Sequence, residues 1–184
     1  DYSLSIPYTD KGSIENAITC FCVITAWGYQ DNPNIIKRFS SLPGIAMRLE
    51  IIEAKDNSSI INDSYNSDIN SLRIALDYLN QKKANKKSVL ILSDILQNSE
   101  DDESLYKTVA EMISNKNIDK LVGVGSAISA YKDLFSENSE FFPSTHALLA
   151  DLQYKSFDNS CILLKAARSF EFERISKSLQ QKSH

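Results

Sequence analysis

Glycine, cysteine and histidine are all scarce in this sequence, and each shortage narrows the kinds of site that the chain can hold. The 184 residues include five glycines, and none stands in the G-x-x-x-x-G-K-[ST] pattern of a phosphate-binding loop. The one Gly-x-Gly, at Gly123 and Gly125, has Ile128 where the dinucleotide-binding pattern needs glycine or alanine. We therefore expect the phosphates of any nucleotide to be held by protein outside this chain.

With only two histidines, and with its three cysteines inside apolar runs, the sequence offers no zinc constellation. A structural zinc takes four Cys or His ligands, and the only histidines are His146 and His184. Cys20, Cys22 and Cys161 lie in apolar runs, which favours buried free thiols and a reducing compartment. The sequence therefore predicts no metal site and no disulfide.

Excess positive charge and long apolar runs are also lacking. Lys and Arg number 20 against 24 Asp and Glu, so a net charge of −4 leaves no positive field to attract nucleic acid. The longest apolar run, 17–27, contains threonines and is shorter than the ~20 residues of a membrane span. We see no signal peptide at the start and expect a cytoplasmic protein with neither nucleic-acid nor membrane partners.

The first part of the chain predicts a small helical unit. Residues 1–9 alternate apolar and polar side chains like a short strand, and Ser13 can cap a helix that ends at Gly28. A second helix begins at Pro33. This unit is too small to bury its own apolar faces, so we interpret residues 1–46 as the end of a domain whose body lies elsewhere.

From residue 47 the pattern changes to strands that alternate with amphipathic helices. Strands that are apolar on both faces, separated by such helices, favour a mostly parallel sheet with helices on both sides, the doubly wound α/β class. We assign residues 47–184 to this domain. The expected strands are 47–52, 59–61, 88–92, 119–124, 141–142 and 161–164. The expected helices are one that Asp68 caps and that finishes in the lysines of residues 82–87, one over 105–113, one through Tyr131 and Leu134, one over 146–152 and one over 170–179.

Ligands of doubly wound domains bind at the carboxyl ends of the strands. The polar segments that follow the expected strands are therefore the candidates for chemistry: residues 62–67, 93–97, Ser126 and 165–169.

Two of these segments carry charged side chains, and for each segment both a ligand-binding and a local structural interpretation remain open. Asp63 can accept the two hydroxyls of a ribose, or it and Ser64 can cap the local backbone while Asn66 forms a turn. Lys165 and Arg168 lie between a strand and a helix start, where cations are unfavourable unless an anion is bound. The local alternative is a solvated Lys165 and an Arg168 paired with Glu171 or Asp94.

Two further charged groups favour structural interpretations. Arg48 and Glu50 would share one face of a strand as a surface ion pair, which contributes little. The acidic run 100–103 suits the first turn of a helix better than it suits a metal.

Four segments of the chain, in this order and spacing, resemble the Mur ligases of peptidoglycan synthesis. The run from Asp63 to Asn66 after a strand is typical of the members that add D-alanyl-D-alanine, and the resemblance extends over about residues 13–175. The four segments are residues 12–17, 47–50, 61–68 and 164–169.

The resemblance implies a three-domain, ATP-dependent ligase of which this chain supplies only a part. Residues 1–46 would end the central ATPase domain, and residues 47–184 would form the carboxyl-terminal, Rossmann-like domain. The amino-terminal domain and the phosphate loop would lie outside the chain, which would be inactive alone. The similarity is greatest to the form that is fused to an alanine racemase.

The resemblance also implies the reaction and the nucleotide contacts. ATP and Mg²⁺ convert the terminal carboxylate of UDP-N-acetylmuramoyl-tripeptide into an acyl phosphate, which the amine of D-alanyl-D-alanine attacks. Asn16 would touch the adenine, Arg48 would reach the nucleotide after domain closure, and Asp63 would bind the ribose hydroxyls. Tyr65 and Asn66 would shape the rim of the same site.

Lys165 and Arg168 would face the acceptor dipeptide or the negative charge of the acyl phosphate, which cations stabilise. Two alternatives remain open. The chain could be a non-enzymatic α/β module that binds a small ligand or a regulator, or it could come from a Mur ligase with another amino-acid acceptor.

Overall fold

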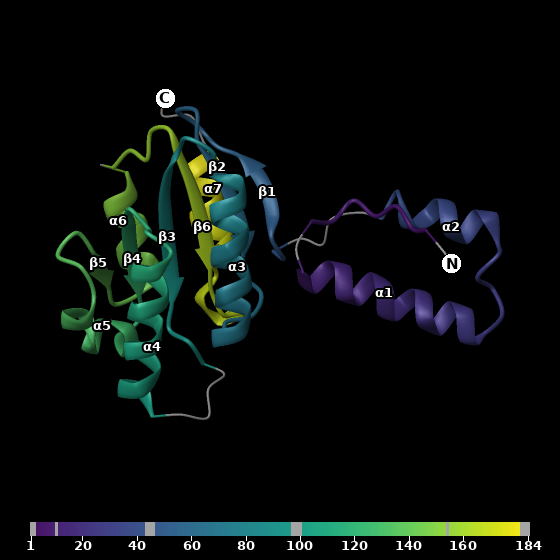
Figure 1. Cartoon of the computed structure of the whole chain (residues 1–184). Coiled ribbons are helices and arrows are strands. Elements are labelled where there is room, and N and C mark those ends of the chain that lie inside the picture. Colours follow the sequence, from purple (N-terminus) through teal and green to yellow (C-terminus); the bar gives the residue numbers. More distant parts are fainter. Residues whose placement is uncertain (1–2, 10, 43–46, 97–100, 154, 181–184) are drawn as a thin grey trace. The chain divides into compact units, whose positions relative to one another are not determined.

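Figure 1 shows the computed structural model of the chain, which describes residues 3–9, 11–42, 47–96, 101–153 and 155–180. The chain divides into two units, residues 1–44 and 45–184. We describe each unit by itself. No helix in the described ranges is long and apolar enough to span a bilayer.

The first unit contains the two predicted helices, α1 (Lys11–Ala26) and α2 (Pro33–Phe39). Gly28, at a φ of +79°, follows the end of α1 as predicted, because glycine adopts this left-handed conformation without steric cost. Ser13 lies inside α1, so the prediction that it caps the helix is wrong. The predicted strand over residues 1–9 is also wrong, since residues 3–9 form no strand. A strand needs a neighbour for its hydrogen bonds, and the described part of this unit offers none.

The thiols of α1 do not follow the prediction either. Cys20 and Cys22 are exposed, whereas Cys161, in the second unit, is buried. The two helices of the first unit meet through a few side chains, among them Phe21 and Phe39, whose ring centroids lie 5.9 Å apart. A single neighbouring helix, α2, covers only one side of α1, and so most of α1 remains at the surface of this unit.

The second unit has the predicted doubly wound architecture around a six-stranded sheet. Its strand order is β1-β2-β6-β3-β4-β5, with β1 antiparallel to β2 and all other neighbours parallel. The strands are β1 (Glu50–Glu53), β2 (Ser59–Asp63), β3 (Lys87–Ser93), β4 (Lys120–Val124), β5 (Glu140–Phe142) and β6 (Ser160–Lys165). The helices are α3 (Ile69–Lys82), α4 (Asp102–Asn115), α5 (Ser126–Ala130), η1 (Lys132–Leu134), α6 (Thr145–Leu152), η2 (Arg168–Phe170) and α7 (Glu173–Gln180).

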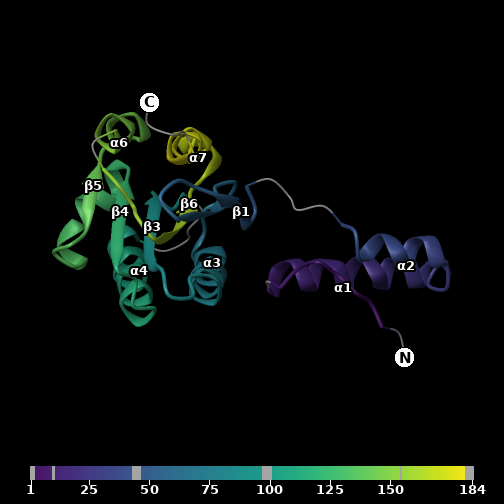
Figure 2. The same cartoon turned by 90° about the horizontal axis from the view of Figure 1, so that it is seen from above.

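The helices lie on both faces of the sheet because the inner strands are apolar on both faces. Leu90 and Leu92 of β3 belong to the core under α3 and α4, and Val89 and Ile91 belong to the core under α6 and α7. Figure 2 shows these two pairs of helices on opposite sides of the sheet. Successive residues of a strand point to opposite faces, so one apolar run supplies both cores.

The order of the strands puts a topological switch point at the carboxyl end of β6, the place where doubly wound domains have their ligand crevice. This strand lies between β2 and β3, and the chain leaves β2 and β3 toward α3 and α4 on one face. It leaves β6 toward α7 on the other face. Loops that depart to opposite faces separate at such a switch point and leave room for a ligand.

Acidic residues cap α3 and α4, the two helices that follow the carboxyl ends of β2 and β3. The Asp68 side chain accepts a hydrogen bond from the Ser71 backbone at 2.9 Å and completes a capping box, as predicted for this helix. Asp101 caps α4, and Asp102 and Glu103 lie in its first turn, which confirms the structural interpretation of these three residues. The first residue of the acidic run lies outside the described ranges.

At the amino ends of the strands, the Asp119 carboxylate is hydrogen-bonded to the start of β3. It accepts hydrogen bonds from the backbone N–H and the hydroxyl of Ser88, both at 2.7 Å. These bonds, and more weakly the charges of Lys83 and Lys87, lower the pKa of Asp119 below its ordinary value of 3.8. The ionised carboxylate is therefore the form that stabilises the fold.

We expect Asp119→Asn to lower the free energy of unfolding by about 1 kcal/mol at neutral pH, since an exposed carboxylate loses charge-assisted hydrogen bonds. This stabilisation is complete above the ordinary pKa of 3.8 and is lost as the pH falls through the lower pKa of the folded state. Urea unfolding at several pH values measures it, with the exposed Asp133→Asn as the control. A difference that does not shrink in acid would contradict this role.

Candidate functional site: the crevice between β2 and β6

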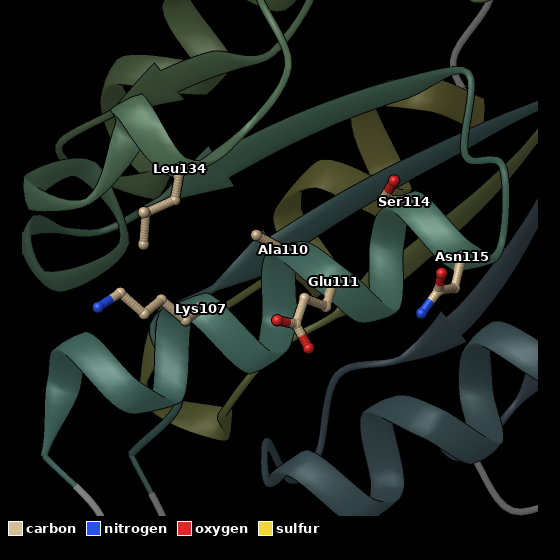
Figure 3. Close-up of a pocket in the computed structure, with 6 residues that line it drawn as sticks. All are labelled: Lys107, Ala110, Glu111, Ser114, Asn115 and Leu134. Carbon is tan, nitrogen blue, oxygen red and sulfur yellow. The ribbon is translucent and has the colours of Figure 1, made fainter.

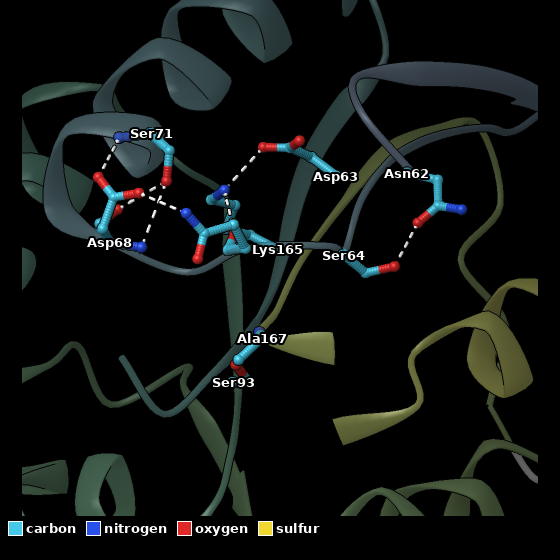
Figure 4. Close-up of polar contacts among 9 residues, drawn as sticks. Asn62, Asp63, Ser64, Asp68, Ser71, Ser93, Lys165 and Ala167 are labelled. Carbon is cyan, nitrogen blue, oxygen red and sulfur yellow. Dashed lines mark hydrogen bonds and ion pairs between the residues drawn. The ribbon is translucent and has the colours of Figure 1, made fainter. Parts of the chain in front are cut away.

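The last residues of β2 and β6 are direct neighbours in the sheet and form a buried ion pair. Asp63 pairs with Lys165 in the register, and the Lys165 Nζ lies 2.8 Å from the Asp63 Oδ2. The same Nζ donates a hydrogen bond to the backbone oxygen of Asn66 at 2.6 Å. The Lys165 side chain is 1% exposed and that of Asp63 is 14% exposed. Figure 4 shows the two side chains pointing toward one another. The solvated Lys165 of the local alternative is therefore wrong.

The protonation of Asp63 depends on its neighbours. Burial raises the pKa of the Asp63 carboxyl, while the charge and hydrogen bond of Lys165 lower it, and burial is the larger effect. The backbone N–H of Leu49 also donates to this carboxylate. Because the group is largely removed from water, Asp63 relies on these donors to remain charged.

A second set of polar contacts joins the loops that follow β3 and β6. The Ala167 backbone N–H donates to the Ser93 Oγ at 3.1 Å, and this hydroxyl donates to the backbone oxygen of Asp94 at 2.8 Å. On the other side, the Ser64 hydroxyl donates to the Asn62 Oδ1 at 2.7 Å, also drawn in Figure 4. Hydrogen bonds therefore hold the loops that follow β2, β3 and β6 at this end of the sheet.

Arg48 lies at the rim of the crevice and not on a strand. The Arg48 guanidinium carbon is 4.7 Å from the ring centre of Tyr65, whose side chain is 52% exposed. Glu50 accepts from the Met47 backbone at 3.1 Å, so the predicted surface pair of Arg48 and Glu50 is wrong. Positive φ angles at Met47 and Leu49 turn the chain before β1 begins, and Arg48 thereby leaves the face that Glu50 occupies.

Arg168 is an exposed cation at the carboxyl ends of the strands. Its side chain is 57% exposed, its Nη1 lies 3.0 Å from a carboxylate oxygen of Glu173, and the Met47 sulfur is 3.2 Å away. Glu171 pairs instead with Arg174 at 3.2 Å. The predicted alternative partners of Arg168, Glu171 and Asp94, are therefore wrong, because the chain turns at η2 and places Glu173 beside it.

Asp94 has a role that the sequence interpretation missed. Its buried carboxylate accepts the backbone N–H groups of Ala127 at 3.2 Å and Ile128 at 2.8 Å, and so caps α5 from the neighbouring loop. Burial, and next the charge of Asp94, raise the pKa of Tyr106, whose hydroxyl accepts a hydrogen bond from the Ile95 backbone N–H at 3.4 Å. The position of Asp94 directly after β3 was the available signal in the sequence. The backbone groups that it accepts from lie more than 30 residues further along the chain.

The remaining predicted residues lie as follows. Asn66 donates to the Asp68 Oδ2 at 3.2 Å and is half-buried, so its side chain braces the start of α3. Asn16 is exposed on α1 in the first unit. The roles assigned to these residues in nucleotide binding stay predictions.

Other hollows lie away from this crevice. Figure 3 shows a pocket of about 510 Å³ along α4, lined by Lys107, Ala110, Glu111, Ser114, Asn115 and Leu134. None of these residues follows β2 or β6. In the described ranges no three His, Cys, Asp or Glu side chains are placed to hold a metal ion, so this part of the chain does not fit Mg²⁺ by itself.

The fold defines a doubly wound α/β domain, a class whose ligands bind at the switch point of the sheet. A family model described as "Mur ligase, glutamate ligase domain" matches residues 47–168. The chain belongs to the Mur ligase family, which confirms the resemblance and the fold class expected from the sequence.

Curated relatives share one name. The UDP-N-acetylmuramoyl-tripeptide--D-alanyl-D-alanine ligases of Bacillus subtilis and Escherichia coli K12 are 27% and 23% identical over 179 and 182 residues. The alignments cover 95% and 96% of this chain but 39% and 38% of the two ligases. The chain thus spans about two fifths of the length of the curated relatives it matches.

Solved structures of similar proteins support the fold. MurF from Acinetobacter baumannii has a TM-score of 0.79 at 22% identity, over 97% of this chain and 39% of that one. The MurF ligase of Thermotoga maritima, solved in complex with ADP, has a TM-score of 0.75 at 17% identity, over 94% and 39%. At these identities the likeness is evidence of a common fold alone.

Proposed function

We propose that this chain is part of an ATP-dependent ligase that joins D-alanyl-D-alanine to UDP-N-acetylmuramoyl-tripeptide in peptidoglycan synthesis. The crevice between β2 and β6, inside the segment that matches the family, carries the proposal. The names of the curated relatives support the choice of substrates, and the ADP complex of the T. maritima ligase supports the choice of nucleotide.

In this proposal the second unit contributes the ribose side of a nucleotide site. Asp63 accepts hydrogen bonds from the ribose hydroxyls through the part of its carboxylate that remains exposed. The exposed Tyr65 ring and the Arg48 guanidinium form a flat, cationic rim beside it, and such a surface suits an anionic ligand with an aromatic base. Asn66 completes that rim.

The other predicted contacts complete the reaction. Asn16 of the first unit contacts the adenine, and the first unit ends the domain that holds the phosphates with Mg²⁺. The γ-phosphoryl group moves to the tripeptide carboxylate, the amine of the dipeptide attacks the acyl phosphate, and inorganic phosphate leaves. Arg168 is the exposed cation that can stabilise the negative charge of that intermediate.

The full-length protein that contains this chain tests the proposal. We expect it to release phosphate from ATP only when UDP-N-acetylmuramoyl-tripeptide and D-alanyl-D-alanine are both present. The 184-residue chain alone is expected to release none. Turnover by the isolated chain, or a full-length protein that uses another amine in place of the dipeptide, would contradict the proposal.

A further inference from the structure

Lys165 is the only lysine or arginine that is buried in the described ranges. Removing an ammonium group from water costs several kcal/mol unless other groups compensate its charge. The two direct contacts come from the end of β2 and the loop that follows it, through the Asp63 carboxylate at 2.8 Å and the Asn66 carbonyl at 2.6 Å. One cation therefore joins the end of β6 to this loop at two points.

These two contacts constrain different features of the loop. The bond to Asp63 selects the side-chain rotamer, and the bond to the Asn66 carbonyl fixes the backbone three residues further along. The exposed Tyr65 lies between the two anchored residues. The direction of the carboxylate and the shape of the rim therefore both depend on the Lys165 ammonium.

A direct contact with a substrate is a poor fit to this environment. The Lys165 side chain has 1% of its surface exposed, whereas the Arg168 side chain has 57% exposed. A substrate anion could reach the Lys165 ammonium only by displacing Asp63, and this would leave a buried carboxylate uncompensated.

We propose that Lys165 is a positioning residue, which acts on the nucleotide through Asp63 and the Asn66 loop and does not touch the acceptor or the reacting atoms. This inference rests on the proposed function, because it requires Asp63 to bind the nucleotide. It assigns the predicted contact with the acceptor or acyl phosphate to Arg168 alone.

Steady-state kinetics of the full-length ligase test the inference. Lys165→Met keeps the length of the side chain and removes its charge. We expect the KM for ATP to rise about tenfold, the usual size of coupling between residues in contact, while kcat at saturating ATP and the KM for D-alanyl-D-alanine change less than about twofold. A raised KM for the dipeptide, or a lower kcat with an unchanged KM for ATP, would overturn it.

A double-mutant cycle shows whether Lys165 acts through Asp63. In an Asp63→Ala background, Lys165→Met is expected to weaken the affinity for ATP less than it does in the wild type, because only the contact with the Asn66 carbonyl is then left to lose. An equal loss in both backgrounds means that Lys165 acts by another route and overturns the inference. If Lys165→Met does not fold, Lys165→Gln replaces it in both measurements, with a smaller rise in the KM for ATP.

Hydrogen exchange of the ligand-free protein separates this inference from the proposed function. The amides of residues 63–67 are expected to exchange faster in Lys165→Met and not in the control Lys107→Met, whose ion pair with Glu103 is exposed. Unchanged exchange overturns the inference alone. A wild-type protein that binds no ATP overturns the proposed function and this inference together.

Discussion

Gly125→Ala is expected to lower the free energy of unfolding of the second unit by about 3 kcal/mol, from backbone strain and overpacking together. Gly125 has a φ of +136°, which is nearly restricted to glycine, and an added Cβ would lie 2.3 Å from the Asp94 carboxylate. That carboxylate cannot move without releasing the N–H groups of Ala127 and Ile128. Strain and collision therefore act together.

The measurement is urea unfolding of the 184-residue chain followed by far-UV circular dichroism. Gly28→Ala is the matched control, because Gly28 has a φ of +79° with no atom near an added Cβ. We expect it to cost about 1 kcal/mol, because it carries the penalty of the positive φ without a collision. A Gly125→Ala protein as stable as the wild type would mean that Asp94 does not lie against this glycine.

Asp63→Ala is expected to weaken the binding of ATP to the full-length protein at least about tenfold, the size of a lost hydrogen bond to a charged group. The substitution also leaves Lys165 buried and unpaired, which destabilises the fold by about 3 kcal/mol or more. Asp63→Asn is therefore measured beside it, since an amide oxygen still accepts from Lys165. Titration calorimetry gives the affinities, and an unchanged affinity in both variants contradicts the ribose role.

The sequence predicts the second unit well because one simple pattern controls it. Apolar strands that alternate with amphipathic helices can bury both faces of the strands only in a parallel sheet with two helical layers. Parallel strands end on the same side of the sheet, so Asp63 and Lys165 were both expected there, but their pairing follows from the adjacency of β2 and β6, which the sequence did not predict. The cap of α3 by Asp68 was predictable because caps are local.

The sequence does not predict which partner a charged group chooses. Arg168 had several acidic candidates, and the turn at η2 places Glu173 beside it. Asp94 caps a helix that begins more than 30 residues later, which requires the relative position of two loops. Such choices depend on tertiary packing, and periodicity carries no information about them.

The position of Arg48 shows a different limit. The residues around it alternate like a strand, yet positive φ angles at Met47 and Leu49 delay the start of β1 to Glu50. Neither side chain favours that conformation, so no local signal announces the turn. The exposed thiols of α1 have a related cause, because the sequence alone does not state how much protein covers an apolar helix.

Binding of the ribose hydroxyls by Asp63 is tested most directly by a thermodynamic cycle that changes the ligand and the protein in turn. Titration calorimetry would compare ATP with 2′,3′-dideoxy-ATP on the full-length wild type and on Asp63→Ala. Removing the ribose hydroxyls is expected to weaken binding about tenfold in the wild type and not measurably in the variant. An equal loss of affinity in the two proteins would show that the hydroxyls bind elsewhere and would contradict the account.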